Sequence, residues 1–101
     1  MTTTSFSNRL EGYEEMKKKT VIFKCEDSLH MKAIAVLIQK ASVYQSSIWL
    51  QRGDRRANAK SLLGVMSLGI ENNMEIEITA EGSDEEEAAN AIAAYLEQPE
   101  F

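Results

Sequence analysis

Residues 61–80, SLLGVMSLGIENNMEIEITA, change their hydrophobic period once and so define two successive elements. Over residues 62–68 the apolar side chains follow the i, i+3, i+4 spacing of one helix face, and Ser61 stands at the N-cap position. Gly69 suits the left-handed residue that ends a helix, which predicts a short helix between these two positions. Over residues 74–80 apolar and polar residues alternate, which predicts a strand with one buried face.

Three strands and one helix are predicted upstream of this stretch. Residues 20–25 alternate as a strand, and the period then changes to that of a helix over about residues 30–43. Residues 47–51 are rich in strand formers, and Gly53-Asp54 separates them from the polar segment 55–59. This pattern indicates a hairpin with a polar second strand.

A last helix is predicted downstream. Ser83 and Glu86 have the spacing of a capping box, acidic residues occupy the first turn, and apolar residues share one face up to Leu96. Asn72-Asn73 predicts the turn before the last strand. The order is therefore β-α-β-β-α-β-α, an α+β domain with a mostly antiparallel sheet and helices on one face. The first β-α-β unit should cross over right-handed and leave room for another strand between its two strands.

Length and composition agree with one small domain. The chain has 101 residues, 44% of them hydrophobic, and a net charge of −5, so it lacks the basic surface that nucleic acid requires. Residues 1–18 form an N-terminal extension whose sequence leaves open whether it is ordered, and residues 19–98 form the domain. One cysteine, and a start without the features of a secretion signal, favour a cytoplasmic protein that does not insert into a membrane.

His30 is the one histidine, and the helix pattern places it at a helix N-terminus. The positive end of the helix dipole favours an anion there, so we expect an accessible ring near free amides that could accept a phosphoryl group. The alternative is a semi-exposed histidine of the loop. Glu26 and Asp27 belong to a polar turn, and Cys25 lies on the core side of its strand, so we expect no metal site, no cofactor and no catalytic triad around His30.

Two features of the sequence concern the second helix. Ser61 is either an N-cap alone or also a phosphorylation switch, and both roles are compatible. Apolar residues at the helix starts, Met31, Leu62, Leu63 and Met66, predict a partner-binding surface with Lys32 and Lys60 on its charged rim. We expect this surface to join the starts of the first two helices.

The segment KSLLGVMSLG at residues 60–69, with Leu29-His30 upstream, resembles the HPr family, the histidine-containing phosphocarriers of the bacterial phosphoenolpyruvate-dependent sugar phosphotransferase system. The similarity runs from about Lys19 to Leu96 and includes VLIQ at 36–39 and ITAEGSDE at 78–85. It implies an HPr-like open-faced β-sandwich, in which a four-stranded antiparallel sheet carries three helices on one face.

The resemblance also implies a function. His30 would accept a phosphoryl group from phosphorylated enzyme I and pass it to sugar-specific enzyme II proteins, as a carrier rather than a stand-alone enzyme. In low-GC Gram-positive relatives, the serine that matches Ser61 is phosphorylated by a dedicated kinase. That modification redirects the protein to a transcription factor of catabolite repression.

The chain departs from the family around the histidine. The family motif is Gly-(Ile/Leu)-His-Ala-Arg-Pro-Ala, whereas residues 28–34 read SLHMKAI. Lys32 replaces an arginine, so a point charge stands where a planar fork could make two parallel bonds to a phosphoryl group. Two hypotheses therefore remain. The chain is a carrier that uses His30 and Lys32, or a regulatory paralogue that acts through Ser61 and transfers phosphate weakly or not at all.

Overall fold

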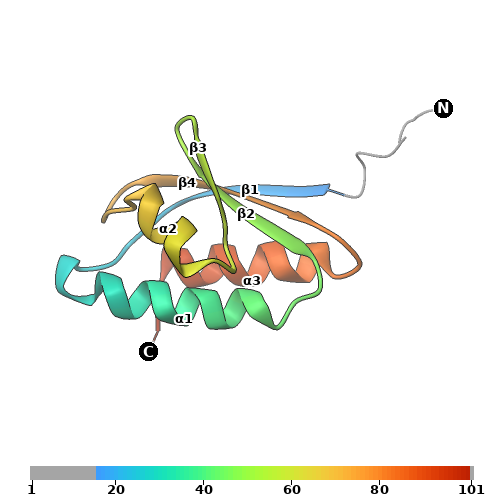
Figure 1. The fold of residues 1–101 in the computed structure, drawn as a ribbon, viewed down its shortest axis with the longest axis horizontal. Helices are drawn as coiled ribbons and strands as arrows, with labels where there is room; N and C mark the ends of the chain where they lie inside the picture. The colour runs from blue at the N-terminus through green and yellow to red at the C-terminus, as the bar shows by residue number, and fades with distance from the viewer. Residues whose placement is uncertain (1–15, 101) are drawn as a thin grey trace.

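The structure is a computed structural model that describes residues 16–100, and it has the predicted order of elements (Figure 1). The elements are β1 (Met16–Ile22), η2 (Asp27–Leu29), α1 (His30–Ser42), β2 (Ser47–Arg52), β3 (Arg55–Asn58), α2 (Leu62–Leu68), β4 (Glu75–Glu81) and α3 (Glu85–Glu97). The sheet order is β1-β4-β2-β3, and every neighbouring pair is antiparallel. The predicted gap between the first two strands is therefore filled by β4.

The core lies between the sheet and the helices, which cover one of its faces (Figure 1). Alternate residues of the strands point inward because successive side chains of a strand face opposite sides. They meet the apolar stripes of the helices, which explains why periodicity predicted this layout. The largest fully buried side chains are those of Phe23, Leu37, Ile48, Leu50, Val65, Leu68, Ile76, Ile78, Ile92 and Leu96.

The first strand lies earlier in the chain than its hydrophobic pattern indicated. It begins at Met16 and ends at Ile22, so it includes residues 16–18, which the sequence analysis assigned to the extension; residues 1–15 lie outside the described part. The lysines of this strand obscure the alternation of apolar and polar residues. Pairing with β4 fixes the register of the strand, with Lys18 opposite Thr79. Beyond the strand, Phe23 and Cys25 are still buried, as the pattern predicted.

The predicted capping box of Ser83 and Glu86 is wrong. Asp84 is the N-cap residue of α3, and no side chain caps that position. The Asp84 carboxylate instead accepts hydrogen bonds from the backbone amides of Gln45 and Ser46, both at 3.0 Å, and from the Ser46 hydroxyl. These bonds, the one from the hydroxyl first, lower the pKa of the Asp84 carboxyl. The start of α3 is thereby joined to the loop before β2.

Gly82 allows this junction to be tight. A Cβ atom at that position would lie 2.7 Å from Ser46 Cα, and the φ of +151° also disfavours any other residue. The Gly82 amide donates to Glu85 Oε1 at 3.0 Å, so a carboxylate of the first helical turn binds the preceding loop.

The C-terminal end of α2 is held by the hairpin as well as by its own cap. Gly69 has a left-handed φ of 68°, as predicted for the residue that ends this helix. Arg52 Nη1 donates to Leu68 O at 3.2 Å and Arg55 Nη1 donates to Ser67 O at 3.3 Å. A helix of seven residues is marginal by itself, so such external bonds stabilise it.

Candidate functional site

His30 is the first residue of α1, which confirms its predicted place at a helix start. The N-cap residue Leu29 contributes no side-chain hydrogen bond, and the first turn carries no acidic residue. The positive end of the helix dipole is therefore not neutralised within the first turn. This end of α1 suits a group that becomes negatively charged.

The His30 ring is more buried than the sequence predicted. Its side chain is 18% exposed, because the ring packs against Phe23, with 5.5 Å between ring centroids, and Nε2 lies 3.0 Å from the Cys25 carbonyl oxygen. The expectation of an accessible ring is wrong in this respect. The partners that bury it come from the segment that follows β1, which helix periodicity could not indicate.

The contact with Cys25 determines which ring nitrogen carries the hydrogen. A carbonyl oxygen can only accept, so Nε2 is the donor and Nδ1 of the neutral ring keeps its lone pair. The Asp27 carboxylate lies 3.7 Å from Nε2, but its side chain is 91% exposed, so water screens that interaction. The arrangement leaves Nδ1 as the ring nitrogen with a free lone pair.

The Cys25 thiol has a packing role, as predicted. The side chain is buried, and its sulfur donates to the Glu26 carbonyl at 3.5 Å. Burial first, and then the charges of Glu26 and Asp27, raise the pKa of the thiol, so it stays protonated at neutral pH. The main-chain carbonyl of Cys25, rather than its thiol, is the group that contacts the His30 ring.

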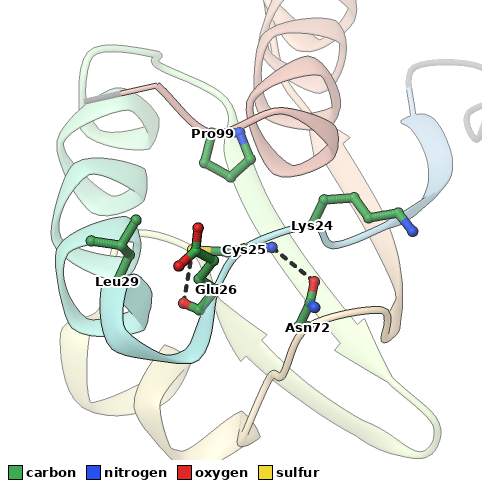
Figure 2. A pocket seen from close by; sticks show the side chains of 6 residues that line it. All are labelled: Lys24, Cys25, Glu26, Leu29, Asn72 and Pro99. Atoms are coloured by element: carbon green, nitrogen blue, oxygen red, sulfur yellow. Dashed lines mark hydrogen bonds between the residues drawn. The ribbon is translucent and has the colours of Figure 1, made fainter.

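An open pocket of about 320 Å³ lies beside this segment (Figure 2). Asn72 lines the pocket from the turn before β4, and its Oδ1 accepts a hydrogen bond from the Cys25 amide at 3.0 Å. The sequence predicted the turn at this position but gave no sign of the contact. The pocket is lined by Lys24, Cys25, Glu26, Leu29, Asn72 and Pro99.

Tyr95 holds the first turn of α1 from the other side. Its hydroxyl donates to the Ala33 carbonyl at 2.8 Å, and burial, followed by the nearby Cys25, raises the pKa of Tyr95 to about 12. The phenol is therefore protonated over the whole physiological range. A signal for this contact was available, because a buried tyrosine hydroxyl usually has a hydrogen-bond partner.

Lys32 is exposed in the first turn of α1. Residues i and i+2 of a helix do not face each other, so its ammonium has to reach past the end of the helix to approach a group on His30. Its predicted part in phosphoryl transfer stays a prediction.

The hydroxyl of Ser61 caps α2, as predicted. Its Oγ accepts from the Gly64 amide at 3.1 Å, and the residue has the extended backbone of an N-cap. Lys60 Nζ donates to the Tyr44 carbonyl at 2.7 Å, which ties the residue before the Ser61 cap to the turn that follows α1.

The two helix starts therefore do not adjoin, and the expectation that one partner-binding surface joins them stays a prediction. The turn after α2 returns to Cys25, just before α1, so α1 and α2 run in opposite senses (Figure 1). The connecting hairpin sets this direction, which helix patterns cannot encode. The predicted apolar residues are nonetheless exposed: Met31 by 60%, Leu62 by 48%, Leu63 by 77% and Met66 by 42%. Whether they bind a partner stays a prediction.

Comparison with known proteins places this site in a family. The model described as the PTS HPr component phosphorylation site matches residues 17–98. The chain belongs to the HPr family. Its four-stranded antiparallel sheet with three helices is the HPr fold.

Relatives and solved structures within the HPr family cover nearly the same part of the chain. The HPr-like protein Crh of Halalkalibacterium halodurans is 35% identical over 83 residues, 82% of this chain and 99% of that protein. Crh of Bacillus subtilis is 31% identical over 83 residues, 82% of this chain and 98% of its own. The crystal structure of the phosphocarrier protein HPr from Bacillus anthracis aligns with a TM-score of 0.77 and 38% identity, over 80% of this chain and 96% of that one.

Two further properties concern residues 16–100 of this HPr-family chain. None of their helices has the length and apolar character needed to cross a membrane. Within the same range, no three histidine, cysteine or acidic side chains gather as metal ligands would.

Proposed function

We propose that this HPr-family chain is a phosphoryl carrier that receives a phosphoryl group on Nδ1 of His30 from phosphorylated enzyme I and passes it to enzyme II proteins. The observation that supports this most directly is the bond between Nε2 and the Cys25 carbonyl. It assigns the hydrogen to one ring nitrogen and leaves the other with its lone pair, at the start of α1.

The transfer requires no proton movement at His30. The Nδ1 lone pair attacks phosphorus, a P–N bond forms, and the bond between phosphorus and the donor breaks with its electron pair going to the donor. The hydrogen stays on Nε2 and remains hydrogen-bonded to the Cys25 carbonyl, which stabilises the positive charge that the ring acquires. The helix start and the Lys32 ammonium stabilise the negative charge of the phosphoryl oxygens.

Burial of the ring limits how the donor can approach. Because only 18% of the His30 side chain is exposed, the donor has to bring its phosphoryl group to a largely covered ring. The exposed side chains of Met31, Leu62 and Met66 provide apolar area for docking such a protein. A docked partner also excludes water from the transfer, which strengthens the electrostatic contacts.

A regulatory role through Ser61 is the second candidate. It is favoured by the position of the serine at the start of α2, followed by the exposed Leu62 and Leu63, and by the similarity to two proteins named Crh. In this alternative a serine kinase modifies Ser61, and the modified surface binds a transcription factor of catabolite repression. His30 then transfers phosphate weakly or not at all.

One experiment separates the two candidates. The protein is incubated with phosphoenolpyruvate and enzyme I, and its intact mass is measured at neutral pH because phosphohistidine is labile to acid. We expect one phosphoryl group on the wild type and on Ser61→Ala, and none on His30→Ala. A wild type that gains no phosphoryl group contradicts the carrier proposal. Phosphorylation by a serine kinase and ATP, lost in Ser61→Ala, then supports the regulatory role.

A further inference from the structure

We infer that Asn72 is a positioning residue for His30. Its side chain holds Cys25 in the place from which the Cys25 carbonyl keeps the hydrogen on Nε2 and the lone pair on Nδ1. The expected effect on phosphoryl transfer rests on the proposed carrier function, whereas the effect on the state of the ring does not.

The path of the chain after β1 shows why this contact matters. Pairing with β4 ends at Ile22, and the next amides donate to acceptors in turn, Phe23 to Met74 O at 2.9 Å and Lys24 to Leu96 O at 3.1 Å. The Cys25 amide then donates to Asn72 Oδ1 at 3.0 Å, after which the chain enters the turn that leads to α1. Asn72 thus fixes the last residue before that turn.

The effect passes through the position of Cys25. The amide that Asn72 binds and the carbonyl that His30 binds belong to the two peptide units on either side of the Cys25 Cα atom. Fixing one unit restricts the rotation of the other, because a residue has only two soft backbone dihedrals. Without the Asn72 bond, the Cys25 carbonyl can move away from Nε2, since the strength of a hydrogen bond falls steeply as its angle worsens.

The turn that carries Asn72 is itself fastened to the same segment. The Asn73 amide donates to Phe23 O at 2.7 Å, and Asn73 has a φ of 69°. The side chain of Asn73 makes a separate bond, accepting from Lys24 Nζ at 2.7 Å on the surface. The two neighbouring asparagines therefore allow a matched comparison, because only Asn72 contacts the Cys25 amide.

Three variants test the inference. Asn72→Ala removes the acceptor, and Asn72→Asp keeps an acceptor by placing a carboxylate oxygen where the amide oxygen was. Asn73→Gly removes the Lys24 bond while tolerating the positive φ. His30 is the one histidine in the chain, so its ring signals are unambiguous in nitrogen-15 NMR spectra. The spectra are recorded at about pH 9, above the range in which a free imidazole titrates.

We expect the wild type to carry its ring hydrogen on Nε2 with slowed exchange against water. In Asn72→Ala that exchange becomes about tenfold faster and the second tautomer appears, as expected for the loss of one hydrogen bond. Asn72→Asp should restore the slow exchange, and Asn73→Gly should match the wild type. Equal spectra for Asn72→Ala and the wild type, or equal changes in both alanine and glycine variants, would overturn the inference.

A measurement on the wild type covers the case in which Asn72→Ala does not fold. Couplings across hydrogen bonds should join Nε2–H to the Cys25 carbonyl carbon, and the Cys25 amide to the side-chain carbon of Asn72. The absence of either coupling contradicts the inference.

Transfer kinetics separate this inference from the carrier proposal. The initial rate of acid-labile phosphate incorporation should fall about tenfold in Asn72→Ala and stay unchanged in Asn73→Gly. A wild type without incorporation contradicts the carrier proposal, while the NMR comparison still decides the role of Asn72. A wild type that reacts at the same rate as Asn72→Ala contradicts the positioning role alone.

Discussion

Replacing Tyr95 with phenylalanine tests how firmly α3 holds the first turn of α1. The tyrosine is 5% exposed, and its hydroxyl donates to the Ala33 carbonyl at 2.8 Å. Tyr95→Phe removes this bond and leaves the ring in place, so about 1 kcal/mol of unfolding free energy should be lost. For a domain of this size, that loss lowers the melting temperature by about 4–8 °C.

The same substitution should change how stability depends on alkaline pH. The pKa of Tyr95 is raised from 10.0 in the unfolded chain to about 12 in the folded protein, so the contribution of the phenol is complete below pH 10. As the pH rises from 10 toward 12, the unfolded state loses its proton first and the stability falls. Tyr95→Phe lacks this decline. The Cys25 thiol, whose pKa is also raised from 9.0, contributes a decline of the same sign in both proteins.

The assay is urea denaturation followed by circular dichroism, for both proteins, at about pH 8 and at about pH 11, on either side of the ordinary tyrosine pKa. At about pH 8 we expect the wild type to be more stable than Tyr95→Phe. At about pH 11 we expect this difference in unfolding free energy to be smaller. Equal stabilities at the lower pH would show that the hydroxyl bond contributes nothing. A difference that stays constant or widens with pH would refute the assigned direction of the pKa shift.

Three other substitutions probe the remaining features. Lys32→Arg restores a planar fork and should raise the initial rate of phosphate incorporation by about ten- to hundredfold. The control Lys40→Arg, in the last turn of α1, should leave the rate unchanged. Equal rates for Lys32→Arg and the wild type would contradict the role of Lys32. Ser61→Ala should lose about 0.5–2 kcal/mol of unfolding free energy while Ser61→Asp keeps the cap, so equal melting temperatures for the pair would contradict capping. The pKa of Asp84 is lowered from 3.8, so its contribution is present above that value and is lost as the pH falls; Asp84→Asn should flatten the acid limb of the stability profile, and an unchanged limb would argue against the carboxylate bonds.

Elements were predictable wherever a residue pattern and its local partners suffice. The strict alternation of residues 74–80 predicted β4, and Ser61 and Gly69 predicted both ends of α2, because an N-cap hydroxyl and a left-handed glycine act within a few residues. The first strand was placed too late because its lysines lie on an edge strand, where alternation is weak.

Features that depend on distant segments were missed. The capping box failed because Asp84 serves the loop before β2, which lies far away in the sequence. The burial of His30 depends on Phe23 and on a backbone carbonyl, and a carbonyl carries no residue-specific signal. For the same reason Asn72 was predicted as a turn residue only. The residues that orient the histidine thus became visible through the tertiary structure.

The bonds at both ends of α2 limit what a modification of Ser61 can do. The helix starts at the serine cap, next to Lys60, whose ammonium donates to the Tyr44 carbonyl. It ends at Gly69, where two arginines of the hairpin donate to the last carbonyls of the helix. These bonds do not involve the Ser61 hydroxyl, so they hold the helix in place whether or not that hydroxyl carries a phosphate. Its effect would be a change in the electrostatic potential over the neighbouring leucines, with the backbone unmoved. A partner would then recognise the modified form by its charge and not by a new conformation.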